Sequence, residues 1–463
     1  MAGVGTTLYL PDLILWEGAV RADLALEVDA AGAIVRAVPA AEAQGAVRLR
    51  GRALLPAMVN AHSHAFQRLI RGRTEYVTTG RESDDFWSWR ESMYRAAEAL
   101  GPEEVYVVSR QAFLEMALAG IGTVGEFHYL HHDPEGRPYA DRNELALQVI
   151  RAARDVGLRI ALLRVGYARA GFEVPPNPRQ RRFIDPDPGR FIEAAHALRE
   201  QTRGDVCVTV GLAPHSVRAV SREWLRAVAR ERGDLCVHMH VAEQPAEIEA
   251  CLREHRRRPV ELVEEMGLLG PHFTGVHAIH LAADEIRSLG AAGANVCACP
   301  GTERNLGDGV VPADALLEAG VHLSLGSDSQ ANIDLLDDAR QLEGHLRLVR
   351  LRRAVLDPGG GGVGGLGARL WAIATEGGAR SLGVPSGTLR PGAPADFVTV
   401  DLSHPSVVGA DAQNLLAAIV FGAQPAAIRD VFVNGRQIVA DGRHPLQQES
   451  GRAFTALAGK VFG

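Results

Sequence analysis

Between residues 54 and 326 the sequence alternates short apolar segments with longer amphipathic ones. The apolar segments have the length of buried strands, and the amphipathic segments, such as 102–119 and 143–156, have the apolar spacing of helices. Strands that alternate with helices build a parallel sheet, and eight such units close into a barrel. We therefore predict an α/β fold, a distorted (β/α)8 TIM barrel, with strands at 54–61, 122–128, 159–166, 206–213, 235–241, 273–278, 294–299 and 322–326.

Both ends of the chain predict β-structure without this alternation. Asn434-Gly435 is a strong signal for a tight hairpin turn. We expect the two ends to pair into one small composite β-sandwich domain, with domain limits of 1–54, 55–385 and 386–463. The strands expected there are 7–16, 24–28, 34–38 and 47–50 at the N-terminal end, and 396–401, 428–433 and 436–440 at the C-terminal end.

The composition limits the partners that the chain can bind. Its net charge of −7 and pI near 6.2 argue against a general nucleic-acid binder. No apolar run approaches the ~20 residues of a membrane-spanning helix, and the N-terminus lacks a signal-peptide pattern. The five cysteines show no paired spacing, and Cys297 and Cys299 fit core positions better than a thiolate site. We expect a cytoplasmic protein without nucleic-acid or membrane partners.

The first barrel strand leads into His62-Ser63-His64. Side chains two apart on a strand point to the same face, so both imidazoles can reach one point at the carboxyl end of this strand. Imidazole is the commonest metal ligand in proteins. On its own this short motif is equally compatible with two polar residues at a strand exit, so further ligands have to come from other strands.

Other strand exits supply candidates for such ligands. His240 ends the fifth strand, with Glu243 three residues further on, and Asp328 follows the eighth strand. Taken alone, His240 could be a core histidine and Asp328 a helix cap. Together with His62 and His64 they form a set of three nitrogens and one carboxylate, which suits one divalent ion, with Zn²⁺ expected and Fe²⁺ as the alternative. His277 ends the sixth strand and belongs to the same constellation, whereas the role of His280 stays open.

This pattern resembles the amidohydrolase superfamily over essentially the whole chain. Many members of that superfamily bridge two metal ions with a carboxylated lysine on the fourth strand. Lys460 is the only lysine of this chain, and it lies four residues from the end of the sequence. The resemblance therefore implies the one-metal branch of deaminases, one divalent ion per chain, and an assembly that is expected to be a homodimer.

A narrower resemblance lies in 62–67, 86–90, 126–133 and 215–218. These segments resemble the formimidoylglutamate deiminases, which hydrolyse formimidoylglutamate, a small dicarboxylate, to formylglutamate and ammonia in histidine degradation. The resemblance assigns substrate binding to Gln67, Arg90, Tyr129, His215 and Arg218, and arginine forks match carboxylates well. Without that context each arginine would be read as a surface charge. His131 and His132 are expected to stay on the surface.

The expected chemistry follows from the positions of three residues. A metal-activated water attacks the formimidoyl carbon, and Asp328 accepts its proton or orients it. Glu243 delivers a proton to the imino nitrogen, and His277 stabilises the tetrahedral intermediate by a hydrogen bond. The long insertions 71–94 and 170–189 are expected to shape substrate access.

Two alternatives remain at this stage. The first is a one-metal deaminase of a purine, pyrimidine or triazine ring, which Trp87 and Trp89 keep open as stacking partners. The second is a non-catalytic scaffold that retains the barrel. The complete ligand set together with Glu243 speaks against a scaffold, because a scaffold has no need of it.

Overall fold

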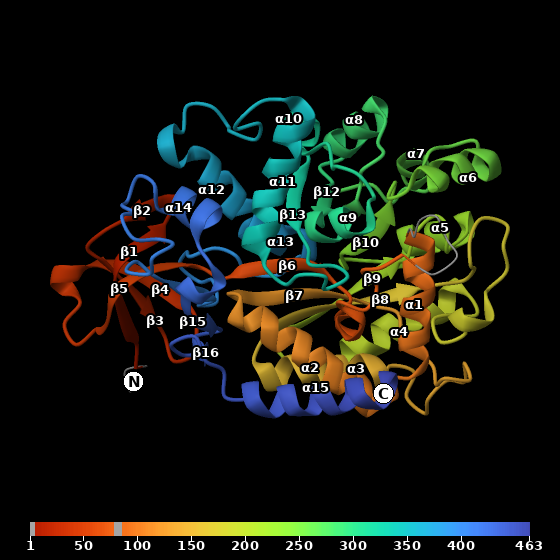
Figure 1. The fold of residues 1–463 in the computed structure, drawn as a ribbon, viewed down its shortest axis with the longest axis horizontal. Helices are drawn as coiled ribbons and strands as arrows, with labels where there is room; N and C mark the ends of the chain where they lie inside the picture. Colours follow the sequence, from red (N-terminus) through yellow and green to blue (C-terminus); the bar gives the residue numbers. More distant parts are fainter. Residues whose placement is uncertain (1–4, 78–85) are drawn as a thin grey trace.

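The computed structural model describes residues 5–77 and 86–463, without the side chains of 86–88. Its centre is a sheet of parallel strands in sequence order, and a parallel bridge between Ser63 and Asp328 links the exits of the first and last strands. The predicted (β/α)8 barrel is therefore confirmed (Figure 1). The barrel strands are β6 (Met58–Ser63), β7 (Ile121–His128), β8 (Arg159–Gly166), β9 (Val208–Pro214), β10 (Val237–Val241), β11 (Phe273–His277), β12 (Asn295–Ala298) and β13 (His322–Leu325).

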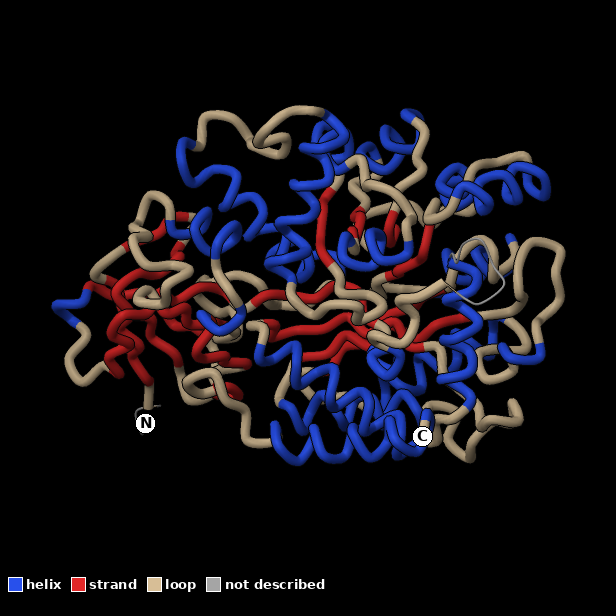
Figure 2. The backbone as a smooth tube through the Cα atoms, in the orientation of Figure 1, coloured by secondary structure: helices blue, strands red, loops and turns tan. Residues whose placement is uncertain are grey.

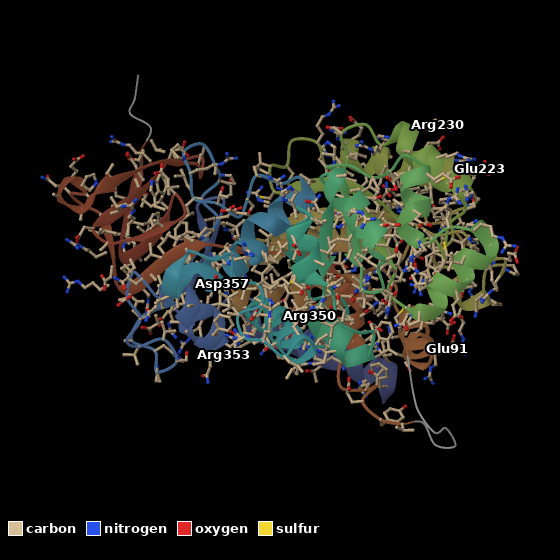
Figure 3. The ribbon with its side chains drawn as sticks, turned by 90° about the horizontal axis from the view of Figure 1, so that it is seen from above. Glu91, Glu223, Arg230, Arg350, Arg353 and Asp357 are labelled. Carbon is tan, nitrogen blue, oxygen red and sulfur yellow. The ribbon has the colours of Figure 1, made fainter. Side chains whose placement is uncertain are left out.

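Helices surround these strands and explain their composition. A strand with the barrel interior on one face and helices on the other is buried on both, so it is apolar throughout. Figure 2 shows the strands running through the centre, and Figure 3 shows charged side chains such as Glu223 and Arg230 on the outer helix faces. The helices are α1 (Phe86–Glu98), α2 (Pro102–Leu118), α3 (Glu144–Val156), α4 (Pro188–Gln201), α5 (Arg222–Glu231), α6 (Pro245–His255), α7 (Pro259–Glu265), α8 (Ala283–Ala291), α9 (Pro300–Leu306), α10 (Ala313–Glu318), α11 (Leu335–Arg350), α12 (Gly365–Ala372) and α13 (Gly378–Leu382).

The second sheet joins both ends of the chain, as the hairpin signal and the strand patterns predicted. Its order is β16-β15-β14-β5-β1-β3-β4, with β2 beside β1, and it forms the β-sandwich domain at one end of the molecule (Figure 1). Phe397 and Phe432 stack in its core with ring centroids 4.2 Å apart. The strands are β1 (Thr7–Trp16), β2 (Ala19–Arg21), β3 (Leu24–Val28), β4 (Ile34–Pro39), β5 (Val47–Pro56), β14 (Phe397–Asp401), β15 (Ile428–Val433) and β16 (Arg436–Val439).

The apolar segment 54–61 differs from the single strand that was predicted. Its first part belongs to β5, where Pro56 pairs with Phe397 of the second sheet. Its second part is β6 of the barrel, whose first residue, Met58, donates its backbone N–H to Gly120. The chain therefore passes from one sheet to the other at Ala57. Both halves are equally apolar because each lies in a core, so their composition does not mark the crossing.

A buried ion pair ties the barrel to the sandwich. Arg159 at the start of β8 contacts Asp396 with Nε and Oδ2 3.1 Å apart, and both side chains are almost fully buried. Asp396 also accepts hydrogen bonds from Asn434 N and Ser386 Oγ. Several donors thus compensate this carboxylate, which is what makes its burial tolerable.

The last helix, α15 (Gln447–Phe462), packs against α2 of the barrel rather than within the sandwich. Figure 1 shows α15 running alongside α2. Glu449 pairs with Arg110 at 2.9 Å, and Lys460 pairs with Glu104 at 2.6 Å. The single lysine therefore lies on the outer surface of the barrel, paired with α2, and not on a barrel strand.

The glycine-rich run 359–367 is not only a loop. Its last three residues begin α12, and a Cβ on Gly367 would lie 2.4 Å from the backbone nitrogen of Ala417. Ala417 belongs to α14 (Leu415–Gly422), so the absence of a side chain on Gly367 lets α12 and α14 approach closely.

None of the helices in residues 5–77 and 86–463 has the length and apolar character needed to cross a membrane.

The Arg159–Asp396 pair leads to a stability prediction. Replacing Arg159 by Met leaves a buried carboxylate without its charge partner, so we expect the free energy of unfolding to fall by about 3–5 kcal/mol. The matched control is Arg154→Met, which removes a surface pair with Asp205 and should cost about 0–1 kcal/mol. Chemical and thermal unfolding of both variants would measure the difference. Equal losses in the two variants would contradict a structural role for the buried pair.

Candidate metal centre and active site

Four side chains from three strand exits converge at the carboxyl end of the barrel. His62 and His64 leave β6, His240 lies in β10, and Asp328 follows β13. The Nε2 atoms of His62 and His64 are 3.2 Å apart, and Asp328 Oδ1 lies 3.5 Å from the first and 3.2 Å from the second. Ligand atoms from all four residues lie within 4.8 Å of one another, so the structure brings together the predicted metal ligands.

Backbone carbonyls fix how two of these imidazoles are protonated. His64 Nδ1 lies 2.9 Å from the carbonyl oxygen of Phe127, and His240 Nδ1 lies 3.0 Å from that of His215. Because a carbonyl only accepts hydrogen bonds, each Nδ1 carries the proton and each Nε2 presents a lone pair to the centre. Burial lowers the pKa of His62 to about 3 and that of His240 well below its usual value, which keeps them unprotonated. Converging lone pairs and a carboxylate are the donor set of a divalent cation.

Two residues of this region, Asp328 and His277, have a strained backbone. Asp328 has φ +45° and His277 has φ +67°, a left-handed conformation that residues other than glycine seldom adopt. Gly326, just before Asp328, packs against His62 so closely that a Cβ there would lie 2.7 Å from the His62 Cβ. Such strain persists only where the surroundings enforce it, and here it aims both side chains at the centre.

His277 stands beside this group, between three carboxylates. Its Nδ1 lies 3.3 Å from Glu303 Oε1, and its Nε2 lies 3.7 Å both from Glu243 Oε1 and from Asp328 Oδ2. Burial alone would lower the pKa of His277, but Glu243, Glu303 and Asp328 together raise it to about 10. His277 is thus arranged as a hydrogen-bond donor. Glu303 was not foreseen from the sequence, because it comes from α9 and no local pattern links it to His277.

A polar network behind the ligands was also not foreseen. Glu126 of β7 accepts hydrogen bonds from Ser63 Oγ at 2.5 Å and from Ala65 N at 2.7 Å. Gln330 Nε2 donates to Ser63 Oγ and to the backbone oxygen of Asp328. Ser63 lies between the two histidine ligands, so this network connects both ends of the metal group. Burial raises the pKa of Glu126 to about 7. The signal was present at the exit of the second strand, where Glu126 interrupts an apolar run.

A small cavity of about 50 Å³ adjoins the metal group. Gln67, on the short helix η2 (Ala65–Ile70), donates to the Tyr129 hydroxyl at 2.8 Å. The structure brings together all five residues to which the resemblance assigned substrate binding, because the cavity lining includes Gln67, Arg90, Tyr129, His215 and Arg218 beside Glu243 and His277. Tyr94, Tyr167 and Phe183 also line it and were not predicted.

Arg218 and Glu243 form an ion pair inside this cavity lining. Arg218 Nη2 donates to Glu243 Oε2 at 2.7 Å, and both side chains are buried. Burial would lower the pKa of Arg218, but the charges of Glu243 and Glu247 raise it above its usual value. One of the two expected substrate-binding arginines is therefore in direct contact with the expected proton carrier.

Several individual expectations have a different outcome. The prediction that His131 and His132 stay on the surface is wrong. His131 is buried with Nε2 2.9 Å from the Val165 oxygen, and His132 is half-buried against Ile184. His280 binds the backbone oxygen of Asp308 and does not line the cavity. The Trp87 side chain lies outside the described residues.

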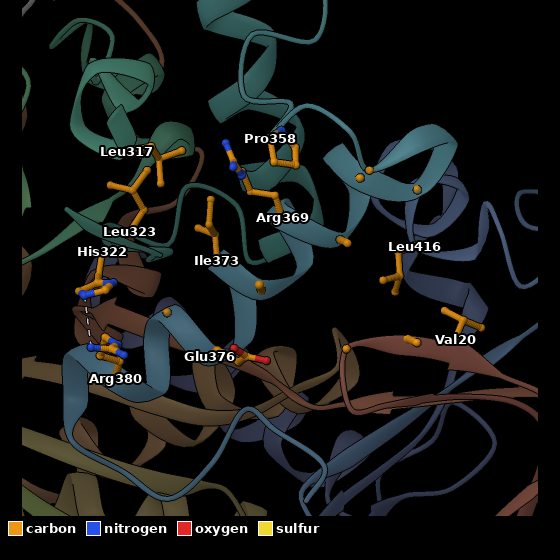
Figure 4. Close-up of a pocket in the computed structure, with 18 of the residues that line it drawn as sticks. Val20, Leu317, His322, Leu323, Pro358, Arg369, Ile373, Glu376, Arg380 and Leu416 are labelled. Carbon is orange, nitrogen blue, oxygen red and sulfur yellow. Dashed lines mark hydrogen bonds between the residues drawn. The ribbon is translucent and has the colours of Figure 1, made fainter. Parts of the chain in front are cut away.

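A larger cavity lies away from the metal group. It has a volume of about 760 Å³ and is lined by Arg369, Glu376 and Arg380, with His322 at the amino-terminal end of β13 (Figure 4). Arg380 contacts His322 there, with Nη1 and Nε2 3.3 Å apart. The metal group lies at the opposite, carboxyl end of the strands. The small cavity is therefore the candidate active site, since it alone of these two adjoins the metal group.

The barrel and its His/His/His/Asp group define a hydrolase with a metal-binding centre. The family model of the amidohydrolase family matches residues 53–438. The chain belongs to the amidohydrolase family. The family membership that the sequence motifs predicted is therefore confirmed.

Individual relatives indicate which members of the amidohydrolase family the chain resembles. The chain is 38% identical to formimidoylglutamate deiminase of Pseudomonas aeruginosa, over 99% of this chain and 100% of that protein. It is 31% identical to 8-oxoguanine deaminase of the same organism, over 84% of this chain and 82% of that protein. The crystal structure of an amidohydrolase from Brucella melitensis superposes with a TM-score of 0.92 at 36% identity, covering 99% and 100% of the two chains.

The geometry predicts one tightly bound divalent ion per chain at low metal concentration. Elemental analysis after dialysis should give about one equivalent, because only one group offers four buried ligands in the described residues. His240→Ala should lose it, whereas the control His196→Ala, an exposed histidine of α4, should keep it. Two ions per chain that are both required for turnover would contradict this prediction.

Proposed function

We propose that this protein hydrolyses N-formimidoyl-L-glutamate to N-formyl-L-glutamate and ammonia, a step of histidine degradation. The observation that carries the proposal is the cavity, which places two arginines and three hydrogen-bonding side chains next to the metal group. The full-length similarity to a formimidoylglutamate deiminase supports the same reaction. A linear dicarboxylate with a terminal formimidoyl group matches both parts of this site.

The reaction adds water to the C=N bond of the formimidoyl group and releases its imino nitrogen as ammonia. A divalent metal ion held by His62, His64, His240 and Asp328 would lower the pKa of water and so supply the nucleophile. Asp328 Oδ2 lies 3.7 Å from His277 Nε2, and this oxygen can accept a proton from the attacking water. Glu243 moves a proton to the departing nitrogen. His277 donates a hydrogen bond from Nε2 to the oxygen of the tetrahedral intermediate.

The carboxylates of the substrate need cationic partners, since a buried unpaired charge is costly. Arg90 lies on α1 with its guanidinium 5.7 Å from the Tyr94 ring centroid, and Arg218 follows β9. Gln67 Oε1 is buried and has no hydrogen-bond partner among the described residues, which leaves an acceptor for the substrate. A substrate carboxylate at Arg218 has to share this guanidinium with Glu243. Binding would thereby loosen the proton carrier from its ion pair.

A ring deaminase of the same family is the second candidate, and the similarity to 8-oxoguanine deaminase favours it. Trp89, Tyr94 and Tyr167 line the cavity and could stack on a ring. A neutral ring, however, offers no carboxylate to Arg90 and Arg218. A direct comparison of formimidoylglutamate, formimidoylaspartate and a nucleobase panel for ammonia release separates the two functions.

We further propose Zn²⁺ as the metal ion, because three imidazole nitrogens with one carboxylate are common zinc ligands. The five cysteines are all free, as expected for a reducing compartment, so we propose a cytoplasmic location. We also propose that the protein assembles as a homodimer and acts on a small dicarboxylate without nucleic-acid or membrane partners.

Glu243→Gln should keep the metal and the fold but lower kcat by about 10²–10⁴-fold, because the amide cannot carry the proton. Steady-state ammonia release with elemental analysis of the same sample measures both quantities. The matched control is Glu249→Gln on α6, an exposed carboxylate whose loss should leave turnover unchanged. A variant with near-native kcat would remove Glu243 from the mechanism.

Arg90→Met should raise KM and lower kcat/KM by the equivalent of about 1.5–3 kcal/mol, the range for hydrogen bonds to charged groups. A formimidoyl compound without the matching carboxylate should lose little further on the same substitution. The double cycle of enzyme variant against truncated substrate measures this coupling.

Two further variants test whether the coupling is specific to the arginines that line the cavity. Arg95→Met changes an exposed arginine of the same helix and should behave as the native protein. Arg218→Met should couple to the other carboxylate and also lower kcat, because Glu243 loses its ion-pair partner. Simple additivity for both cavity arginines would show that they do not hold the substrate, and the ring-deaminase function would then be favoured.

A further inference from the structure

The two oxygens of Asp328 face different sets of donors. Oδ1 lies within 3.5 Å of the Nε2 atoms of His62 and His64, as a ligand of the first metal position. Oδ2 lies 3.7 Å from His277 Nε2, on the other side of the carboxylate. A carboxylate that faces two donor sets in this way can bridge two cations, which lie about 3.5–4 Å apart in two-metal sites.

A thiol completes the second set. Cys299 follows β12 and is buried, and ligand atoms of His277, Cys299 and Asp328 all lie within 4.8 Å of one another. Bonds of about 2.0–2.3 Å would place the ligand atoms of one Zn²⁺ within about 4 Å of each other, so small side-chain movements suffice to close the group. Glu243 Oε1, 3.7 Å from His277 Nε2, can provide a fourth ligand.

The surroundings of His277 are those of a metal-binding histidine. Its Nδ1 faces Glu303 Oε1 at 3.3 Å, which directs Nε2 toward Asp328 and Glu243. A carboxylate that receives the second ring N–H is the usual partner of a histidine ligand. Glu243, Glu303, Asp308 and Asp328 also place several buried acidic side chains around this one imidazole. An additional positive charge would therefore be stabilised here.

We propose that His277, Cys299 and Asp328 Oδ2 form a second, weaker cation position, which binds a thiophilic divalent ion such as Cd²⁺ or excess Zn²⁺ and thereby inhibits the enzyme. The inhibition rests on the proposed function, because the bound ion takes His277, Glu243 and Asp328 away from proton transfer. The binding itself depends only on the three ligands.

The thiol decides which cations can bind. Binding displaces two protons, that of the Cys299 thiol and that on Nε2 of His277, and both are released to solvent. Only a cation with high affinity for sulfur overcomes this cost, so Mg²⁺ and Ca²⁺, which prefer oxygen ligands, are excluded. The first position has no thiol and consequently fills first.

The test is a titration of the one-metal enzyme with Cd²⁺. Thiolate-to-cadmium charge-transfer absorption reports binding without any substrate, and ammonia release measured in parallel reports inhibition. We expect the absorption to saturate at one added Cd²⁺ per chain, together with the loss of turnover. If the protein acts on a different substrate, the absorption still reports the site, so the two proposals can fail separately.

Two cysteine variants locate the ligand. Cys299→Ser should retain basal turnover, lose the absorption and require at least ~10-fold more Cd²⁺ for inhibition, since even outer ligand partners contribute that much to metal affinity. Cys297→Ser, two residues earlier and within β12, should keep both the absorption and the sensitivity. Absorption that persists in Cys299→Ser, or inhibition of the native enzyme without absorption, would overturn the proposal. If Cys299→Ser does not fold, ¹¹³Cd NMR of the native enzyme decides: a second resonance shifted by one sulfur ligand supports the site, and its absence refutes it.

Discussion

The structure depends on one electrostatic constraint, the convergence of three imidazole nitrogens and a carboxylate at a single buried point. Hydrogen bonds from Nδ1 to the carbonyls of Phe127 and His215 turn two of the lone pairs inward. Such an arrangement is repulsive unless a cation compensates it, so the barrel has to be rigid enough to enforce it. The left-handed backbone at Asp328 and His277 and the network of Glu126, Ser63 and Gln330 are consequences of that requirement.

The same carboxylates connect binding with chemistry. Glu243 contacts Arg218 through one oxygen and approaches His277 with the other. Asp328 belongs to the metal group and also approaches His277 through Oδ2. In the proposed reaction, a substrate carboxylate, a proton and a cation would therefore compete for the same few buried groups. In a low-dielectric cavity each of these competitors changes the free energy of the others strongly, because screening by water is weak. On these proposals, substrate recognition, turnover and inhibition by soft metal ions would all depend on one charge cluster.

The fold could be predicted wherever a local pattern has one structural meaning. The strands β8 and β15 were placed without error, because turn residues and helices bound them clearly. The passage from β5 to β6 at Ala57 was missed, since both strands are buried and hydrophobicity does not distinguish one core from another. The helix α15 was not predicted, and neither was its position on the barrel. An amphipathic helix specifies that one face is covered, but not by which partner.

The sequence by itself determined the barrel and the residues at its strand exits, because the two-residue period of a strand and the parallel topology bring those exits together at one edge. His62, His64, His240 and Asp328 could be predicted on that ground, and the absence of a lysine on the fourth strand, together with the family resemblance, pointed to one metal ion per chain. Only the tertiary structure decided which groups touch. The Arg218–Glu243 pair, the Glu303 partner of His277 and the approach of Cys299 to Asp328 join residues from different βα units. Their distances depend on how eight strands tilt and close around one axis, and no local sequence pattern encodes that geometry.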